Sequence, residues 1–257
     1  MSNDSHRSPV QPIGRFVAMK RIVPHSLRRL WRSFVKRRND SRGVVCYSQE
    51  GEDIVLSKLF AAELADREFS GFYIDVGAHH PKRFSNTYFF YRHGWSGINI
   101  DAMPGSMRSF LRCRRRDVNI EAAVSDDGAS LEYCAFEEPA YNGFLSESSR
   151  QQLIERGVTL IWTKSLVTRR LDDILAEHLP AGQAIHFLSV DVEGHDLAVL
   201  RSLDWMRYRP RVVVVELSTA SVNDAFSHPA HRYLASLEYV LSSKLCNSCI
   251  YVSNGVR

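Results

Sequence analysis

Acidic residues stand at the ends of five apolar segments of this chain, and carboxylates in such a series can form a binding site. Each of these acidic residues is at the end of, or closely follows, a short apolar segment typical of a buried β-strand. In a doubly wound sheet the carboxyl ends of the parallel strands meet at one crevice, so we expect these side chains to converge there. One such acid alone is equally well explained as a strand-end cap, and it is the series that favours a site. The five residues are Asp75, Asp101, Asp126, Asp191 and Glu216.

The turn after the first segment, residues 75–81 (DVGAHHP), limits the kind of ligand. Gly77 lets a ligand approach the backbone closely, and Asp101 at the end of the next strand can accept hydrogen bonds from both hydroxyls of a ribose. A nicotinamide cofactor is disfavoured, because the turn has one glycine where the G-x-G-x-x-G fingerprint has three, and because Asp75 would repel a pyrophosphate. S-adenosylmethionine has no phosphate and carries cationic sulfonium and ammonium groups, so acids around it are electrostatically favourable.

Strand and helix patterns alternate along the chain from residue 50 onward. This alternation predicts an α/β fold with a mostly parallel sheet and helices on both of its faces. Residues 239–253 are typical of two strands joined by a tight turn, an antiparallel hairpin that closes the sheet, and Pro104 is placed to open a helix at its first turn. Strands are predicted over 72–76, 96–102, 118–128 with a turn at its end, 130–136, 185–191 and 211–217, and helices over 52–67, 85–94, 104–115, 170–179 and 194–203.

Six motifs resemble those of the FkbM-type S-adenosylmethionine-dependent methyltransferases and occur in the same order. The resemblance extends from about Tyr47 to Val252. The resemblance implies a Rossmann-like class I methyltransferase fold, in which a seven-stranded, mostly parallel sheet has its last strand antiparallel and helices on both faces. It also implies transfer of a methyl group to oxygen, on a sugar, a glycan or a small-molecule natural product. The motifs are YSQEGED (47–53), DVGAHHPKRFSNTYFFY (75–91), GWSGINIDAMPG (94–105), AAVSD (122–126), RRLDDIL (169–175) and LSVDVEGHDLAVL (188–200).

The same resemblance implies which residues bind S-adenosylmethionine. One departure from the common first motif of methyltransferases is that Ala78, His79 and His80 stand where further glycines are usual. The implied binding residues are Asp75 and Gly77 at the methionine part, Asp101 at the ribose hydroxyls, Ser125 and Asp126 at the adenine edge, and Gln49 and Glu52 over the cofactor. Asp191 is a further expected cofactor contact because it ends a strand at the same edge.

Methyl transfer to a hydroxyl needs an aligned acceptor oxygen and a group that takes its proton. His195, four residues after Asp191 at the start of helix 194–203, is the first candidate for this general base, because a helix N-terminus favours the neutral imidazole. Packing or capping is the alternative role for His195. Asp191 and Glu216 are candidate catalytic carboxylates and weak candidates for magnesium ligands, since bound Mg²⁺ would lower the pKa of the acceptor hydroxyl.

Residues 137–157 are irregular and polar, and we expect them to form a loop over this site. Tyr141, Asn142 and Phe144 are the expected contacts of the acceptor within that loop. The pattern predicts a small-molecule or sugar hydroxyl as the acceptor and leaves its identity open.

The first 45 residues differ in charge from the rest, and we predict them to be an extension separate from a methyltransferase domain at 46–257. They carry 11 Lys and Arg against two acids, a net charge of +9, whereas the remainder has a net charge of −5. Apolar residues recur at helical spacing from Leu27 to Val35 among arginines, which predicts an amphipathic helix. Residues 16–42 are suited to peripheral contact with an anionic membrane, and docking onto the main domain or a partner chain is the alternative.

Several classes are disfavoured by the chain as a whole. No apolar run approaches the roughly 18 residues of a membrane span, and the start lacks the hydrophobic region of a secretory signal. We therefore expect a cytoplasmic protein, with any membrane contact at the inner face. A noncatalytic Rossmann-like binding protein that docks through its basic leader is the alternative function. Nucleic acid is not an expected partner, because DVEGHD stands where a D-P-P-Y-like motif would follow the strand, and self-association into a homo-oligomer is left open.

Overall fold

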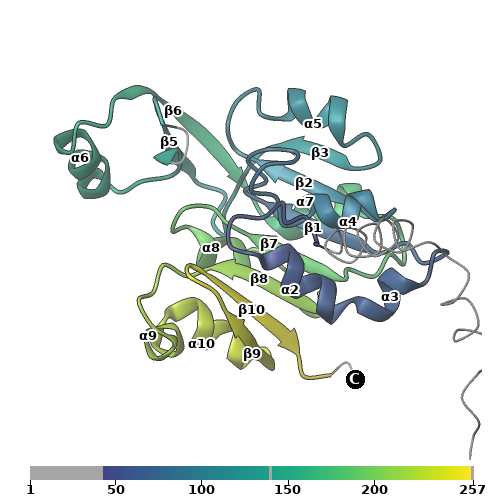
Figure 1. Cartoon of the computed structure of the whole chain (residues 1–257). Helices are drawn as coiled ribbons and strands as arrows, with labels where there is room; N and C mark the ends of the chain where they lie inside the picture. The colour runs from purple at the N-terminus through teal and green to yellow at the C-terminus, as the bar shows by residue number, and fades with distance from the viewer. Residues whose placement is uncertain (1–42, 139–140, 256–257) are drawn as a thin grey trace, which may run out of the picture. The chain divides into compact units, whose positions relative to one another are not determined.

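A large β-sheet forms the centre of the computed structural model, which describes residues 43–138 and 141–255, and a smaller sheet extends from it (Figure 1). The larger sheet has seven strands in the order β3-β2-β1-β7-β8-β10-β9. β10 runs antiparallel to both of its neighbours, and the other pairs are parallel, which confirms the predicted sheet with an antiparallel last strand. Its strands are β1 (Phe72–Val76), β2 (Ser96–Asp101), β3 (Val118–Glu121), β7 (Phe187–Val190), β8 (Val212–Glu216), β9 (Tyr239–Lys244) and β10 (Ser248–Ser253).

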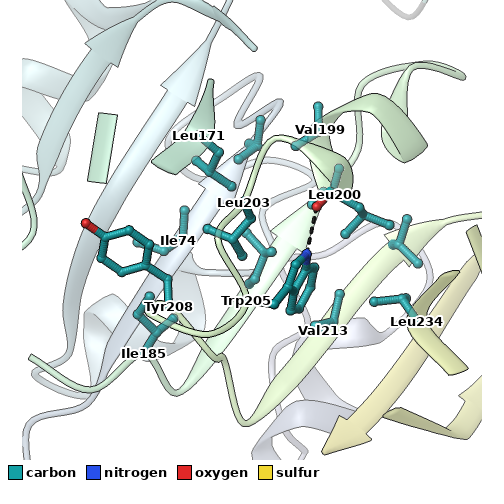
Figure 2. Close-up of a cluster of buried hydrophobic side chains, with 14 of the residues drawn as sticks. Ile74, Leu171, Ile185, Val199, Leu200, Leu203, Trp205, Tyr208, Val213 and Leu234 are labelled. Atoms are coloured by element: carbon teal, nitrogen blue, oxygen red, sulfur yellow. Dashed lines mark hydrogen bonds between the residues drawn. The ribbon is translucent and has the colours of Figure 1, made fainter. Parts of the chain in front are cut away.

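Alternate residues of the central strands fill two hydrophobic cores, one on each face of this sheet. Ile74 of β1 belongs to the core that α7, α8 and α10 cover, and Tyr73 belongs to the core that α2 and α4 cover. In the first core the indole N–H of Trp205 donates to the carbonyl of Leu200 at 2.8 Å (Figure 2). The predicted helices on both faces are thus confirmed. The helices are α2 (Glu52–Leu59), α3 (Ala61–Ala65), α4 (Tyr88–Arg92), α5 (Met107–Cys113), α6 (Glu147–Glu155), α7 (Leu171–His178), α8 (Asp196–Arg201), α9 (Val222–Ser227) and α10 (Pro229–Ser236).

Two predicted helices differ from the structure at one end. The helix predicted over 52–67 breaks at Phe60, whose φ of −107° and ψ of 27° end α2 while its ring is fully buried against Trp95. Pro104 was expected in the first turn of its helix, and this was wrong. α5 begins at Met107, because Gly105 has a φ of +83°, which a right-handed helix does not accommodate.

A smaller sheet with the order β4-β6-β5 carries an arm of the chain, residues 130–169, beyond the larger sheet (Figure 1). The arm contains α6, which corrects the prediction that 137–157 is wholly irregular. α6 has no buried residue, so it lacks the apolar period by which a helix is recognised, and the hydroxyl of Ser146 caps its first turn. The strands are β4 (Ala123–Val124), β5 (Ser130–Phe136) and β6 (Leu160–Arg169).

The described residues of the predicted domain at 46–257 belong to one unit. The predicted amphipathic helix at 27–35 lies outside the described residues, and the boundary between leader and domain stays a prediction. Within 43–138 and 141–255, helices are too short or too polar to cross a membrane.

Candidate active site

A cavity of about 550 Å³ opens at the carboxyl edge of the parallel strands, where the sequence predicts the ligand crevice. The ends of four adjacent strands form its floor, and segments from three other parts of the chain form its walls. The floor includes Val76, Ile100, Asp191 and Glu216, and the wall residues are Gln49, His79, Arg83, Phe84 and, from the arm, Tyr133, Glu138 and residues 142–144. Asp101, Asp191 and Glu216, predicted from separate strands, therefore share one cavity with Gly77 and Gln49.

Gly77 brings two strand ends closer than any other residue type would allow. Its φ is +84°, and a Cβ at this position would lie 1.7 Å from the carbonyl oxygen of Asp191. Its N–H donates to the carbonyl of Ile100 at 2.9 Å, and the N–H of Asp191 donates to the carbonyl of Val76 at 3.0 Å. These contacts fix the relative positions of β1, β2 and β7 at the floor of the cavity.

Three carboxylates gather in this floor, namely Asp191, Glu193 and Glu216. One oxygen from each lies within 4.8 Å of the others, and Asp191 and Glu193 are exposed to solvent at the mouth of the cavity whereas Glu216 is half-buried. Desolvation within the cavity, followed by the neighbouring Glu216 carboxylate, raises the pKa of Asp191 well above its usual range. Desolvation, with Glu216 and Asp196 nearby, raises the pKa of Glu193 to about 7. Such a cluster can take up a proton or a cation near neutral pH.

Glu193 was missed by the sequence reasoning, although it lies in the DVEGHD motif. The prediction took acids that end strands, and Glu193 stands in the turn beyond β7. Asp196 shapes that turn, because its buried carboxylate accepts the N–H groups of Val192 at 3.2 Å and Gly194 at 3.1 Å. Burial is the main cause that raises the pKa of Asp196 to about 7. The sequence signal that could have identified Glu193 is the spacing D-x-E followed by a glycine, in residues 191–194.

Asp101 holds the turn that follows β1 against the end of β2. One carboxylate oxygen accepts the N–H of His79 at 2.8 Å, and the other accepts the N–H of Met103 at 2.9 Å. Burial raises the pKa of Asp101, and these two hydrogen bonds oppose the rise. Each oxygen has a further lone pair, so the residue can still accept hydrogen bonds from a ligand in the cavity.

Strained backbone is concentrated around the cavity. Three non-glycine residues that line it have left-handed conformations: His79 with φ 51°, Phe84 with φ 56° and Glu193 with φ 55°. Phe84 is 49% exposed, and the guanidinium of Arg83 lies 4.7 Å from its ring centroid. Residues held in such conformations cluster at functional sites, since the strain is retained only where a particular geometry is needed. This concentration supports the cavity as the functional site.

Gln49 and Glu52, both predicted to cover the cofactor, have different positions. Gln49 lines the cavity. Glu52 is buried at the start of α2, where it accepts the hydroxyl of Ser248 at 2.7 Å, while Glu50 accepts the N–H of Asn247 at 2.8 Å. The two acids attach the segment that carries Gln49 to the beginning of β10.

Asp75 lies below the cavity, in a buried polar network. It accepts the hydroxyl of Thr87 at 2.8 Å, and Thr87 accepts a hydrogen bond from Arg114 at 2.9 Å. Arg114 also donates to Asp117 at 2.8 Å, and both side chains are 0% exposed. Burial raises the pKa of Asp75 to about 6. The network therefore supports the end of β1, and Gly77 lines the cavity whereas Asp75 does not.

The remaining predicted residues lie beside the cavity. His195 directs its Nε2 to the hydroxyl of the buried Ser125 at 3.1 Å, and its ring centroid is 6.0 Å from that of Phe144. Asp126 lines a separate depression with Arg170, whose guanidinium donates to the Asp126 carbonyl at 2.9 Å. The predicted roles of these residues in adenine binding and proton transfer stay predictions.

The arm supplies one wall of the cavity, as expected of residues 137–157. Asn142 accepts the N–H of Phe136 at 2.7 Å, and paired backbone hydrogen bonds join Cys134 to Gly143. Of the three predicted acceptor contacts, Asn142 and Phe144 line the cavity together with Tyr133, whereas Tyr141 lies on the outside at 42% exposed.

The strand order with its single antiparallel strand, and the acidic cavity at the carboxyl edge, are those of a Rossmann-like methyltransferase. Residues 75–241, more than half of the chain, match the profile of the methyltransferase FkbM domain. The chain belongs to this family, as the sequence motifs predict, and membership implies the use of S-adenosylmethionine. A search of curated proteins found no match.

Proposed function

We propose that this protein transfers the methyl group of S-adenosylmethionine to a hydroxyl oxygen of a sugar, a glycan or a small-molecule natural product. The observation that carries the proposal is that Asp191, Glu193 and Glu216 converge in the cavity that also contains Gly77 and Asp101. A cavity rich in carboxylates suits a cationic cofactor without phosphate. The close approach at Gly77, where a side chain would fill the space, suits a ligand lying against the backbone.

Different residues of the cavity would bind the cofactor and position the acceptor. In the bound state Asp101 would accept the ribose hydroxyls, Gly77 would border the amino acid part of the cofactor, and Gln49 would cover it; all three line the cavity. When bound, S-adenosylmethionine supplies an electrophilic methyl group. The protein then has to hold the acceptor oxygen in line with that group, and the wall formed by the arm is suited to this.

The proton of the acceptor hydroxyl needs a base within hydrogen-bonding reach. The carboxylate of Glu193 is the favoured candidate, because it lines the cavity and its pKa lies near neutrality. His195 is the second candidate; it lies beside the cavity, with its ring centroid 6.0 Å from that of Phe144, which lines the cavity. A third proposal is that Asp191, Glu193 and Glu216 hold Mg²⁺, which would polarise the acceptor hydroxyl.

The proposal is tested by calorimetry with S-adenosylmethionine, followed by a mass-shift screen of glycans, lipid-linked sugars and small-molecule alcohols. We expect one binding site and an increase of one methyl group in an acceptor. With that acceptor, Glu193→Gln should lower kcat at least about 100-fold while His195→Ala lowers it less, and Glu68→Gln, at an exposed position, should have no effect. Absence of cofactor binding would contradict the function, and full activity in EDTA would exclude the metal.

For the basic leader we propose peripheral contact with an anionic membrane through residues 16–42. The sequence supports this by its +9 charge and amphipathic pattern. Liposome sedimentation of chains with and without residues 1–42 tests it, and equal partitioning of both would leave docking on a partner as the explanation.

A further inference from the structure

A second cavity, of about 630 Å³, opens at the amino-terminal edge of the parallel strands, opposite the candidate active site. Its lining includes the end of α7, the turn that follows it, and the segment 207–211 that leads into β8. Ser253 at the end of β10 completes the lining. Its volume lies within the roughly 300–1,000 Å³ of small-molecule sites, and its lining residues are distinct from those of the active-site cavity.

The charge of this second cavity is opposite to that of the active site. Among the described residues, its lining contains Arg207, Arg209 and Arg211 but neither Asp nor Glu. Arg211 forms an ion pair with Glu63, and Arg209 donates to the carbonyl of Leu237 at 2.6 Å. These two side chains are therefore partly committed to the fold.

Arg207 is the cation left to recognise a ligand. Its guanidinium lies over the ring of Tyr208, 4.9 Å from the centroid, and within the described ranges it makes no ion pair. The neighbouring carboxylate of Asp204 accepts the backbone N–H groups of Met206 at 3.0 Å and Arg207 at 3.2 Å, and it makes no hydrogen bond with the Arg207 guanidinium among the described residues. An anion that entered the cavity would therefore find a guanidinium free of competing carboxylates.

Tyr208 is an independent indication of a ligand. It lines the cavity and is 6% exposed, yet its buried hydroxyl has no hydrogen-bond partner among the described residues. Figure 2 shows the contrast with Trp205, whose N–H is satisfied by Leu200, whereas the hydroxyl of Tyr208 points away from the other side chains drawn. Buried tyrosine hydroxyls usually find a partner, and an unsatisfied one is costly. This hydroxyl exposes less than 1 Å², so a ligand group that reached it through a small movement of the ring would gain a hydrogen bond that the described residues do not supply.

The other walls are mostly apolar, and they indicate the rest of the ligand. Gln183, His186 and Ser253 are their polar residues, and the large apolar side chains are Leu175, Leu179, Pro180, Ile185 and Pro210. A ligand here would therefore meet apolar surface on most sides and positive charge at one end.

We propose that this second cavity binds a small amphiphilic anion, whose phosphate or carboxylate group is held by Arg207 beside the Tyr208 hydroxyl and whose apolar part lies against the end of α7. This site is separate from the active-site cavity, so the proposal does not depend on the proposed methyltransferase function.

The test is calorimetry of the full chain with octyl phosphate, octanoate, inorganic phosphate and octyl glucoside, each below its micellar concentration. We expect octyl phosphate or octanoate to bind, with the preferred one identifying the headgroup, and inorganic phosphate and neutral octyl glucoside to bind at least about tenfold more weakly. Arg207→Gln should weaken the binding about tenfold or more, and Arg67→Gln, an exposed arginine elsewhere, should not.

Tyr208→Phe gives a second readout that does not depend on a cation. It retains the buried ring and removes the unpartnered hydroxyl, so it should raise the Tm of the free protein while weakening octyl phosphate binding several-fold. Both variants should bind S-adenosylmethionine as the unchanged chain does. The proposal is overturned if neither anion binds, if octyl glucoside binds as tightly as the anions, or if Arg207→Gln has no effect.

Discussion

The close approach at Gly77 yields a sharp prediction for the variant Gly77→Ala. A left-handed φ of +84° costs an alanine about 1–2 kcal/mol. The added Cβ would also lie 1.7 Å from the carbonyl oxygen of Asp191, and separation to 3.0 Å requires a shift of about 1.3 Å between two strand ends. Overpacking of this kind costs a further 1–3 kcal/mol, roughly, so the variant should lose about 2–5 kcal/mol of unfolding free energy.

Gly94→Ala is a matched control, because Gly94 has a φ of +93° and a methyl group added there would have no other atom within 4 Å among the described residues. It should lose only the backbone contribution of about 1–2 kcal/mol and leave the active site unaffected. Gly77→Ala, by displacing Asp191, should also weaken S-adenosylmethionine binding at least about tenfold. Urea denaturation and calorimetry measure both quantities. Equal losses of stability in the two variants, with unchanged cofactor binding, would refute the reasoning.

Two further predictions concern buried charge. Arg114→Met leaves the carboxylate of Asp117 buried without its cation, and it should lower the unfolding free energy by about 3–5 kcal/mol in urea denaturation; a loss below about 1 kcal/mol would mean that the pair is not structurally important. The pKa of Asp196 is about 7 in the folded protein, above its ordinary value of 3.8, so its contribution to stability is largest below about pH 4 and is lost as the pH rises to about 7. Asp196→Asn should therefore flatten the pH dependence of the unfolding free energy between about pH 4 and 7, by an amount on the order of 4 kcal/mol, and an unchanged slope would contradict this assignment.

The parallel part of the larger sheet was predictable from the sequence because most of its strands are short apolar runs with an acid at or next to their last residue. β7 and β8 are buried along almost their whole length, and such runs stand out among amphipathic helices. The arm was less predictable. β6 has mostly exposed or half-buried residues, and α6 has none that is buried, so neither shows the period that reveals an element packed on a core.

Site residues that end a strand were predictable from the sequence. Site residues whose side-chain direction depends on the conformation of a turn were less predictable. Asp101, Asp191 and Glu216 reach the cavity because parallel strands end at one edge. Asp75 also ends a strand, but its side chain falls on the face that α4 covers, where Thr87 binds it. Glu193 reaches the cavity only through a left-handed backbone conformation held by Asp196, and no local sequence period indicates such a conformation.

The arm at 130–169 has a consequence for how such enzymes diversify. In sequence the arm lies between β4 and α7. Its residues Tyr133, Asn142 and Phe144 line the cavity, and they lie outside the sheet that carries Gly77 and Asp101. A lineage can therefore replace this wall by insertion, deletion or recombination while it inherits the opposite side of the pocket intact. Chimeras exchanged at residues 129 and 170 would test whether this wall sets acceptor preference.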